Sequence, residues 1–557
     1  MALSHDSALS HDSPVVEPGP QEAAPAPEPI GARPRWWGPA AGLTAAAAAL
    51  GVGQLVSGFD ATFKPPVVSV GDRVIDVVPG WVKDFAIDTF GTNDKPALIT
   101  GTVVILAVVA VLAGIAALGR RLLVGLGLVA GFTAMGMIAA TTGRDGHATG
   151  WVPSLAAGLA AAGALVLFRR ASRMAATTGP DAPTGPDAPA RTAAGTTMAR
   201  RGFLVALGAV AVGAAALGAG GQGLRRRFSA DLERATVRLR RPAKPLALPP
   251  TDPAATIEGL TPLIVANRDF YRIDTALITP SVSIDNWQLR IDGMVGRPIT
   301  LSYDELWNRE LVEVDVTLSC VSNEVGGGLV GNARWVGVRL NSLLAEAQID
   351  ADADQIMSHS VDGFTAGFPT DTVTDGRNAI IALTMNGEVL PVAHGYPARL
   401  VVPGLYGYVS ATKWLSRLEM TRFDRAQGYW VPRGWSALGP IKTQSRIDVP
   451  RAGATRSRSE LPEGELVVAG VAWAPGPGID RVEVQVDEGP WLVAELGPEL
   501  SQTSWRQWWL AWPAQPGAHT LRCRATDGNG VTQTAERADP APDGASGWHR
   551  VEVTIKR

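Results

Sequence analysis

Cysteine is scarce in this chain, with two among 557 residues. Cys320 follows a run over 312–318 in which valine and leucine alternate with polar residues, the pattern of a β-strand. The next segment, Val321–Gly327, is polar and ends in glycine, which predicts a flexible turn. A strand that delivers a thiol to such a turn suits a metal ligand or a nucleophile better than a core position. Two cysteines exclude a disulfide framework and a four-cysteine zinc site.

The elements around Cys320 predict a mixed α/β domain over 251–450. Short strand-like runs occur at 287–291 and 398–402, and short helices are expected at 302–308 and 341–347. Ser302 and Glu305 have the spacing of a capping box, in which each side chain satisfies a backbone N–H at the start of a helix.

Five stretches of this domain, in order, resemble the molybdopterin-binding domain of the sulfite oxidase family. They are Phe270–Asp274, Leu289–Val295, Cys320–Asn323 with Asn332–Gly337, Ser360–Phe364, and His394–Gly407 followed by Lys413–Leu415. The resemblance implies a molybdenum–molybdopterin cofactor and oxygen-atom transfer to or from a small-molecule substrate. It also implies that electrons pass to an external carrier.

The resemblance assigns three residues to the metal and the cofactor phosphate. Cys320 would be the thiolate ligand to molybdenum and a catalytic residue, because a soft thiolate suits this metal. Arg399 and Lys413 match the cationic positions that bind the phosphate, where arginine offers a two-pronged fork and lysine a point charge. Taken alone, each of these two cations would be read as part of a solvated strand edge.

The remaining candidates follow from the same motifs. His394 would hydrogen-bond the cofactor, and Asp362 would accept hydrogen bonds from the pterin amines, although an Asp before a glycine is also an ordinary turn. Tyr271 and Arg272 match the first cofactor-contacting segment. Tyr429 is the candidate for the active-site tyrosine, with a core aromatic as the alternative.

The loop after Cys320 departs from the family pattern. Sulfite oxidases place arginine soon after the metal cysteine, whereas this chain has Glu324 and Val325 there. Fewer cations and an extra carboxylate should disfavour a dianion such as sulfite. Reduction of neutral sulfoxides, as in methionine-sulfoxide-reductase relatives, is therefore the alternative, although those relatives generally lack a C-terminal domain. The substrate and the direction of the reaction stay open.

Five charge-free apolar segments predict a transmembrane region before this domain. They run over 36–58, 97–118, 122–142, 149–168 and 202–222, each about as long as the roughly 20 residues that cross a bilayer. Four helices over 36–168 and a fifth over 201–224 are expected. A disordered tail at 1–35 and flexible linkers at 169–200 and 225–250 complete the region.

Arginine placement predicts the orientation of these helices. Arg33 and Arg35 precede the first segment, Arg120 and Arg121 lie between the second and third, and more follow the fourth. The positive-inside rule then places the N-terminus in the cytoplasm, the loop at 59–96 outside, and residues from 225 onward on the extracytoplasmic side of the cell membrane. Arg200-Arg201 before the fifth segment resembles a twin-arginine export signal, and the alternative is an ordinary transmembrane helix.

Composition narrows the remaining partners. A net charge of −3 makes nucleic acid an unlikely partner. None of the seven histidines lies in an apolar segment and no Cys-x-x-Cys-His motif occurs, so we expect no haem. The helices would serve as an anchor and a partner-docking region, and the lack of polar groups in them disfavours a transporter subunit.

Residues 451–557 predict an all-β, immunoglobulin-like sandwich. Alternating runs at 465–473, 481–486, 505–512 and 518–526 are separated by glycine-containing turns. The domain resembles the dimerisation domain of sulfite oxidases, which implies a possible homodimer. Cys523 fits a buried core thiol, and a Cys320–Cys523 disulfide is the alternative. A non-enzymatic, membrane-anchored binding module is the rival from another functional class, and it predicts no metal.

Overall fold

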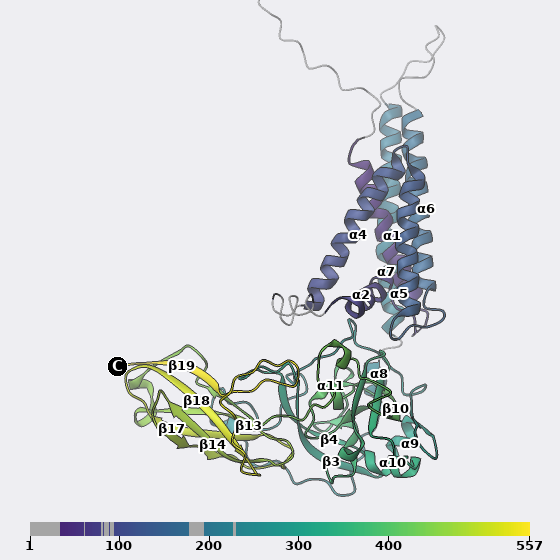
Figure 1. Cartoon of the computed structure of the whole chain (residues 1–557). Helices are drawn as coiled ribbons and strands as arrows, with labels where there is room; N and C mark the ends of the chain where they lie inside the picture. The colour runs from purple at the N-terminus through teal and green to yellow at the C-terminus, as the bar shows by residue number, and fades with distance from the viewer. Residues whose placement is uncertain are drawn as a thin grey trace, which may run out of the picture.

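The computed structural model describes residues 34–60, 62–79, 82, 89, 94–177, 194–226 and 230–557. A helical bundle is followed by two β-rich domains that lie side by side at one end of it (Figure 1). Most of the predicted tail at 1–35 and residues 178–193 of the predicted linker lie outside the described residues. The side chain of Arg200, in the twin-arginine-like motif, also lies outside them.

Among the described residues, five helices form the bundle, and each is long and apolar enough to cross a membrane. They are α1 (Trp37–Ser57), α4 (Asp94–Leu118), α5 (Leu122–Thr142), α6 (Val152–Thr177) and α7 (Ala194–Arg226). Each contains most or all of one predicted apolar segment. Helices α6 and α7 continue past the apolar residues into arginine-containing turns, because backbone hydrogen bonding along a helix does not stop where hydropathy does.

Small residues bring the helices of the bundle together. A Cβ atom at Gly42 of α1 would overlap the carbonyl oxygen of Ala110 in α4, so only glycine permits this approach. The Trp37 ring of α1 stacks on Phe203 of α7, with the ring centroids 4.0 Å apart. Close packing at glycine and alanine is typical of helix association in lipid.

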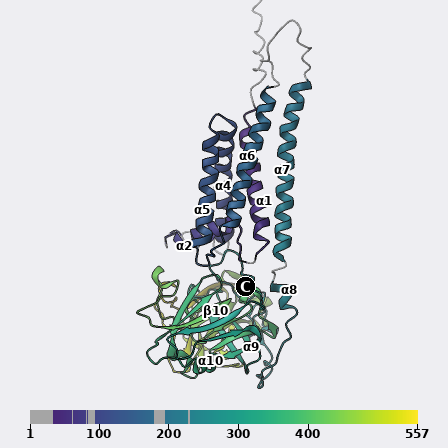
Figure 2. The same ribbon diagram turned by 90° about the vertical axis from the view of Figure 1, so that its right-hand side faces the viewer.

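Two shorter helices join the bundle to the rest of the chain. Helix α2 (Pro66–Val77) lies at the end of the bundle that faces the β-rich domains (Figure 2). Helix α8 (Ala230–Arg234) follows α7 and packs against the first of these domains.

The first β-rich domain contains two sheets. One has the order β2 (Ile299–Ser302), β1 (Gln288–Gly293), β10 (Leu415–Thr421), β5 (Gln355–Ser360) and β6 (Thr365–Pro369). The other has the order β3 (Leu311–Ser319), β4 (Val330–Arg339), β7 (Ile380–Met385) and β8 (Glu388–Val389), with β9 (Arg399–Val401) also paired to β7. Strands β1 and β10 run parallel, so the chain between them, which includes the second sheet, crosses over before it returns.

Three helices and several 3₁₀ turns complete this domain. The helices are α9 (Tyr303–Trp307), α10 (Leu340–Ala347) and α11 (Gly407–Ser410). The predicted capping box is confirmed, since the Ser302 side chain accepts from the Glu305 N–H and the Glu305 carboxylate accepts from the Ser302 N–H. The 3₁₀ turns across both β-rich domains are η2 (Pro253–Ala255), η3 (Thr370–Val373), η4 (Val392–His394), η5 (Val431–Arg433), η6 (Arg458–Glu460) and η7 (Pro462–Gly464).

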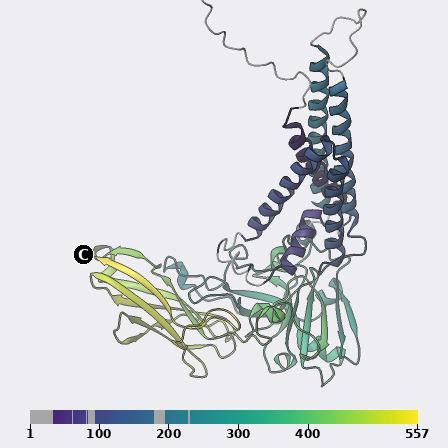
Figure 3. The ribbon, with the colours of Figure 1, turned by 45° about the horizontal axis from the view of Figure 1, so that its top comes forward.

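The C-terminal domain is a sandwich of two sheets. One has the order β11 (Gln444–Val449), β13 (Glu465–Trp473), β17 (Arg506–Pro513) and β16 (Glu495–Leu496); the other has β12 (Ala454–Ser457), β19 (His549–Lys556), β18 (Gly517–Asp527), β14 (Ile479–Val486) and β15 (Trp491–Val493). A single core joins the sheets and includes Trp508 and Cys523, both fully buried. Figure 3 shows this domain extending to one side of the bundle. The buried position predicted for Cys523 is confirmed, and both cysteines are free thiols.

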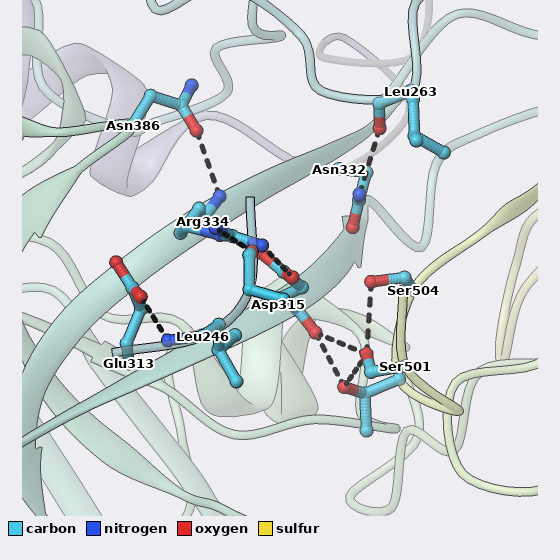
Figure 4. A network of polar contacts seen from close by, with 11 residues as sticks. Leu246, Leu263, Glu313, Asp315, Asn332, Arg334, Asn386, Ser501 and Ser504 are labelled. Atoms are coloured by element: carbon cyan, nitrogen blue, oxygen red, sulfur yellow. Dashed lines mark hydrogen bonds and ion pairs between the residues drawn. The ribbon is translucent and has the colours of Figure 1, made fainter. Parts of the chain in front are cut away.

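A polar network fastens the β3–β4 hairpin to its surroundings (Figure 4). Arg334 of β4 forms a bidentate pair with Asp315 of β3, at 2.8 Å through both Nε and Nη2. The Asp315 carbonyl accepts from Ser501 Oγ of the C-terminal domain at 2.9 Å. The Asn332 amide donates to the carbonyl of Leu263 at 2.9 Å. The strand that leads to Cys320 is therefore fixed on three sides.

Candidate active site

Cys320 lies directly after β3, at the entrance to a short loop that returns to β4. Its backbone N–H donates to the carbonyl of Leu329 at 2.9 Å, and the Asn323 side chain accepts from the Leu329 N–H at 2.7 Å. The cysteine is 8% exposed. The glycine-rich sequence predicts a flexible turn, yet these bonds close the loop into a defined shape.

The C-terminal domain holds the same loop from its other side. Arg446 of β11 donates through Nη1 to the carbonyl of Gly327 at 2.8 Å. Gly326 has a φ of +80°, and a Cβ there would overlap the ring of His549. Glycine is thus required at this position by both backbone conformation and space. The Cys320 loop lies at the junction of the two β-rich domains.

Two tyrosines and a lysine lie near enough to the Cys320 thiol to interact with it electrostatically. Burial raises the pKa of this thiol, while hydrogen bonds from Ser322 and the charge of Lys413 act in the opposite direction. Burial also raises the pKa of Tyr271, and a cysteine thiolate would raise it further. For Tyr406 the same two effects, together with Asp543, raise the pKa to about 12. Both phenols therefore stay protonated and can donate hydrogen bonds at neutral pH.

Arg399 and Lys413 form a buried cationic cluster next to this thiol. Arg399, on β9, is 5% exposed and donates through its two Nη atoms to the carbonyls of His394 at 3.1 Å and Ala411 at 3.2 Å. Its Nε is buried and has no hydrogen-bond partner. Among the described residues, no carboxylate lies within ion-pair distance of Arg399. Burial lowers the pKa of Arg399 to about 10.

Lys413 has a single carboxylate partner. Its Nζ lies 2.9 Å from Asp274 Oδ2, and the same oxygen is 2.9 Å from Arg272 Nε. Burial lowers the pKa of Lys413 to about 8, and Asp274 opposes this shift. Arg272 and Lys413 therefore share one carboxylate, and Arg399 adds a third cation nearby, which leaves a net positive charge in a largely buried place.

A glycine lets the two buried cations approach each other. Gly395 has a φ of +114°, and a Cβ there would lie 3.0 Å from Arg399 Cβ and from Lys413 Cα and Cβ. A larger residue at this position would push the two side chains apart, so we attribute the glycine to this approach.

His394 closes the cluster on the side of η4. Its Nε2 lies 2.8 Å from the carbonyl of Asn267, which can only accept, so Nε2 carries the proton and Nδ1 is an acceptor in the neutral ring. Burial lowers the pKa of His394 to about 4, so the ring is neutral at pH 7. The Phe270 ring lies edge-on to His394 at 5.7 Å and stacks on Tyr271 at 5.3 Å.

Asp362 and Tyr429 lie on the side that faces the helical bundle. Asp362 is buried after β5, and its Oδ1 accepts from the Phe364 N–H at 3.1 Å, as in an ordinary Asx turn. The Tyr429 ring lies 5.8 Å from Phe364 and directly beneath Arg433, whose Cζ is 3.7 Å from the ring centroid. The structure thus groups Tyr271, Arg272, Cys320, His394, Arg399 and Lys413 in one cluster, and connects Tyr429 to the same domain through the turn after Asp362.

Comparison with known proteins gives a consistent assignment. Residues 276–430 match the model of the oxidoreductase molybdopterin-binding domain. The oxidoreductase YuiH of Bacillus subtilis is 30% identical over 153 residues, which cover 28% of this chain and 74% of YuiH. This chain belongs to the sulfite oxidase-like family of molybdopterin oxidoreductases. Its residues 276–430 form an oxidoreductase molybdopterin-binding domain.

Two further comparisons, one with a curated protein and one with a solved structure, show how much of the chain is matched. Human mitochondrial sulfite oxidase is 29% identical over 332 residues, which cover 50% of this chain and 59% of the human protein. The chain therefore spans somewhat more than half the length of that relative. The solved structure of the sulfane dehydrogenase SoxCD from Paracoccus pantotrophus is 24% identical, with a TM-score of 0.45, and covers 54% of this chain and 83% of that one.

The residues of the cluster fit the cofactor of this family. The buried, unpartnered Nε of Arg399 and the excess of cations over carboxylates both suit a phosphate, which would supply the missing acceptor and negative charge. Within the described part of the chain, no group of three or more His, Cys, Asp or Glu side chains could hold a metal. At Cys320 the chain supplies one soft thiolate, the donor that a dithiolene-bound metal would still need.

Sequence reasoning missed three members of this oxidoreductase's cluster. Asp274 pairs with both Arg272 and Lys413, Tyr406 interacts electrostatically with Cys320, and the Trp335 ring centroid lies 5.0 Å from the Arg399 guanidinium. All three occur inside the motifs that carry the family resemblance. Their positions could have drawn attention, but their contacts depend on how the motifs pack together.

Proposed function

We propose that this protein is a membrane-anchored, extracytoplasmic molybdenum enzyme that transfers an oxygen atom to or from a small sulfur compound. The observation that carries the proposal is the buried cationic cluster beside Cys320, in which Arg399 has an orphaned Nε and no carboxylate partner among the described residues. Bound molybdopterin would supply oxygen-atom transfer coupled to a two-electron change at its metal.

Each residue of the cluster has a defined task in this proposal. Cys320 provides the thiolate ligand, and Arg399 with Lys413 binds the phosphate. The neutral His394 ring offers Nδ1 to the cofactor as a hydrogen-bond acceptor. Tyr271 donates a hydrogen bond to the cofactor from its phenol, which burial keeps protonated. Arg272 orients Asp274, which in turn holds Lys413.

Asp362 and Tyr429 have separate roles, Asp362 toward the cofactor and Tyr429 toward the substrate. The second Asp362 oxygen would accept hydrogen bonds from the pterin amines. Tyr429 would hydrogen-bond the substrate and exclude water from it, since the ring is 6% exposed.

The membrane orientation is supported by the arginines of the bundle. Arg169 of α6 donates through Nη1 to the carbonyl of Gly119 at 3.0 Å, so it lies beside the α4–α5 turn that contains Arg120 and Arg121. This turn is at the end of the bundle away from the β-rich domains (Figure 1). The positive-inside rule then favours an extracytoplasmic catalytic half. Protease shaving of intact spheroplasts should release fragments of residues 251–557, and protection of this half would contradict the orientation.

Elemental analysis is the direct test of the cofactor. Full-length protein matured in a host that makes molybdopterin should contain about one molybdenum per chain, and Cys320→Ala should lose molybdenum or activity. Cys523→Ala is the matched control, because this thiol is buried in the C-terminal core. Molybdenum-free wild-type protein from a competent host would refute the proposal.

A neutral sulfoxide is the second candidate substrate, and Glu324 favours it. This carboxylate is exposed on the Cys320 loop, where a cation would favour sulfite. A panel of sulfite and methyl sulfoxides, assayed with an artificial electron carrier, should separate the candidates. We expect sulfite oxidation to dominate and to require an external carrier. Turnover of sulfoxides alone would replace the first candidate with the second.

A further inference from the structure

The helical bundle does more than lie beside the catalytic domain: it contacts Tyr429. Arg144, in the loop between α5 and α6, has its Cζ 4.7 Å from the centroid of the Tyr429 ring. Arg433 lies against the same ring at 3.7 Å. The Tyr429 hydroxyl makes a long hydrogen bond of 3.5 Å to Asp76 Oδ1 at the end of α2. Figure 2 shows α2 and the ends of the bundle facing this domain.

Arg144 and Asp76 form an ion pair that is largely shielded from solvent. Arg144 Nε lies 2.7 Å from Asp76 Oδ1, and the two side chains are 16% and 6% exposed. Arg144 Nη1 also donates to Thr275 Oγ1 at 2.9 Å, and Arg433 Nη2 donates to the Asp76 carbonyl at 3.4 Å. Shielding such a pair from water costs desolvation free energy, so its geometry has to be well defined to persist.

The backbone of the α5–α6 loop touches the turn after β5. A Cβ at Gly363 would lie 2.5–2.6 Å from Arg144 Cβ, carbonyl carbon and carbonyl oxygen, and Gly363 has a φ of +78°. Only glycine allows the loop to come this close. Arg144 is thus in contact with the residue that follows Asp362 in the proposed cofactor site.

Helix α2 makes a second contact with the proposed site. Asp72 Oδ1 accepts from the Leu277 N–H at 3.4 Å, and the Leu277 side chain packs against Gly71. Lys64 lies 2.6 Å from Asp72 and also pairs with Asp145 of the α5–α6 loop, so helix and loop are joined. Thr275 and Leu277 follow directly on the segment that contains Tyr271, Arg272 and Asp274.

We propose that Arg144 and Asp76 are positioning residues for Tyr429, so that the membrane region completes the active site rather than only anchoring it. The inference rests on the proposed function, since it concerns the tyrosine assigned to the substrate side. It predicts that the catalytic half needs the bundle for full activity even when its cofactor is in place.

The charges around Tyr429 give the proposal a directional test. Burial raises the pKa of Tyr429, the Arg144 and Arg433 guanidinium groups lower it, and Asp76 raises it. Lys64, Asp72, Arg73, Asp145, His147 and Asp362 are other ionisable side chains on the segments packed around it. Removing the Arg144 charge should raise the pKa of Tyr429, and removing the Asp76 charge should lower it.

The test uses full-length protein in lipid nanodiscs, with Arg144→Gln, Asp76→Asn and Arg144→Lys. Arg73→Gln is the matched control, because it removes one positive charge from α2 just as Arg144→Gln removes one from the α5–α6 loop. Arg73 lines an apolar groove with Met135 and Ile138 of α5. The readouts are molybdenum content, kinetics of sulfite oxidation from about pH 6 to 11, and hydrogen exchange of backbone amides over 428–434.

Arg144→Gln should lower kcat/KM by about 10- to 100-fold, because a displacement of about 1 Å at a reacting group has an effect of this size. Its molybdenum content should stay unchanged, and exchange over 428–434 should rise at least severalfold. The alkaline limb of the pH profile should move up for Arg144→Gln and down for Asp76→Asn. Arg144→Lys should recover part of the loss, and Arg73→Gln should stay within twofold of wild type.

Two results would overturn the proposal. If hydrogen exchange over 428–434 in Arg144→Gln equals that in Arg73→Gln, the contact does not hold this segment. If exchange is faster in Arg144→Gln but the kinetics are unchanged, the contact stabilises the fold without positioning Tyr429 for the reaction. Failure of the proposed function would look different. Wild-type protein would then lack molybdenum or sulfite turnover, while the exchange comparison would still report on the contact.

Discussion

Replacing Arg399 with methionine should separate cofactor binding from folding. In cofactor-free protein the substitution removes a buried cation whose desolvation costs several kcal/mol. It also removes two charge-assisted hydrogen bonds to the carbonyls of His394 and Ala411 and a cation–π contact with Trp335, each worth about 1–3 kcal/mol. These contributions oppose each other, so the free energy of unfolding should change by less than about 2 kcal/mol.

In protein that contains the cofactor, the same substitution should have a much larger effect, which is a loss of affinity for the cofactor. A phosphate held by the Arg399 fork gains charge-assisted hydrogen bonds of about 1.5–3 kcal/mol each, so losing two costs about 3–6 kcal/mol, or roughly 150- to 25,000-fold in affinity. Molybdenum per chain should fall well below that of wild type after dialysis. Arg377→Met is the control, because Arg377 pairs with Asp375 near the domain surface.

The assays are elemental analysis of dialysed protein and thermal unfolding of protein made in a host without molybdopterin synthesis. Two outcomes would show that the reasoning is wrong. One is a cofactor-free Arg399→Met protein whose free energy of unfolding falls by more than about 3 kcal/mol, the size expected when a structurally essential buried charge interaction is lost. The other is wild-type molybdenum content after dialysis.

Three further predictions concern stability. His394 and His549 each have a pKa of about 4 in the folded protein, against 6.5 in the unfolded chain. Protonation therefore favours the unfolded chain. Each histidine should contribute about 3 kcal/mol of stability that is lost as pH falls from 6.5 to 4. His394→Asn should remove roughly half of this slope in unfolding titrations, and a full slope would contradict the buried neutral ring. Lys413 has an effect of the same sign at higher pH: its pKa of about 8 against 10.5 means that cofactor-free protein should gain stability as pH rises from 8 to 10.5, and Lys413→Met should flatten this rise. Asp315→Asn should lower the free energy of unfolding, measured with denaturant, by about 3–5 kcal/mol because it leaves Arg334 without its buried partner. The control Asp375→Asn, in a more exposed pair, should change this free energy by no more than about 0.5 kcal/mol. Equal effects of the two substitutions would contradict the role of the hairpin network.

Local sequence patterns were sufficient for most of the secondary structure. The alternating run before Cys320 becomes β3, and the run at 465–473 becomes β13 with identical bounds. The apolar segment at 122–142 is helix α5. Such patterns work because the side-chain period of a strand or helix is set by the backbone and is visible within one turn or a few residues. The ends of α6 and α7 were less predictable, since a helix can continue beyond its apolar part.

The donor set of the site was also readable from the sequence. One soft thiolate, an arginine, a lysine and a histidine occur in motifs of a known order, and the chemistry of these residue types is independent of packing. Their grouping around Cys320 depends on tertiary packing, since Arg399 lies on β9, which pairs with β7, and Lys413 precedes β10 of the other sheet. Asp274 and Tyr406 were invisible as site members, because a carboxylate or phenol in a motif does not reveal which neighbour it faces.

What the sequence alone determined is the set of parts: apolar helices of membrane length, a strand that ends in a thiol, cations for a phosphate, and a β-sandwich. Only the tertiary structure decided that Arg399 keeps an unpartnered Nε and that the Asp274 carboxylate pairs with both Arg272 and Lys413. It alone brought Asp76 within hydrogen-bonding distance of Tyr429, 353 residues away in the chain. Contacts of this kind depend on how separately folded regions pack, and periodicity, which is a local property of the chain, carries no information about them.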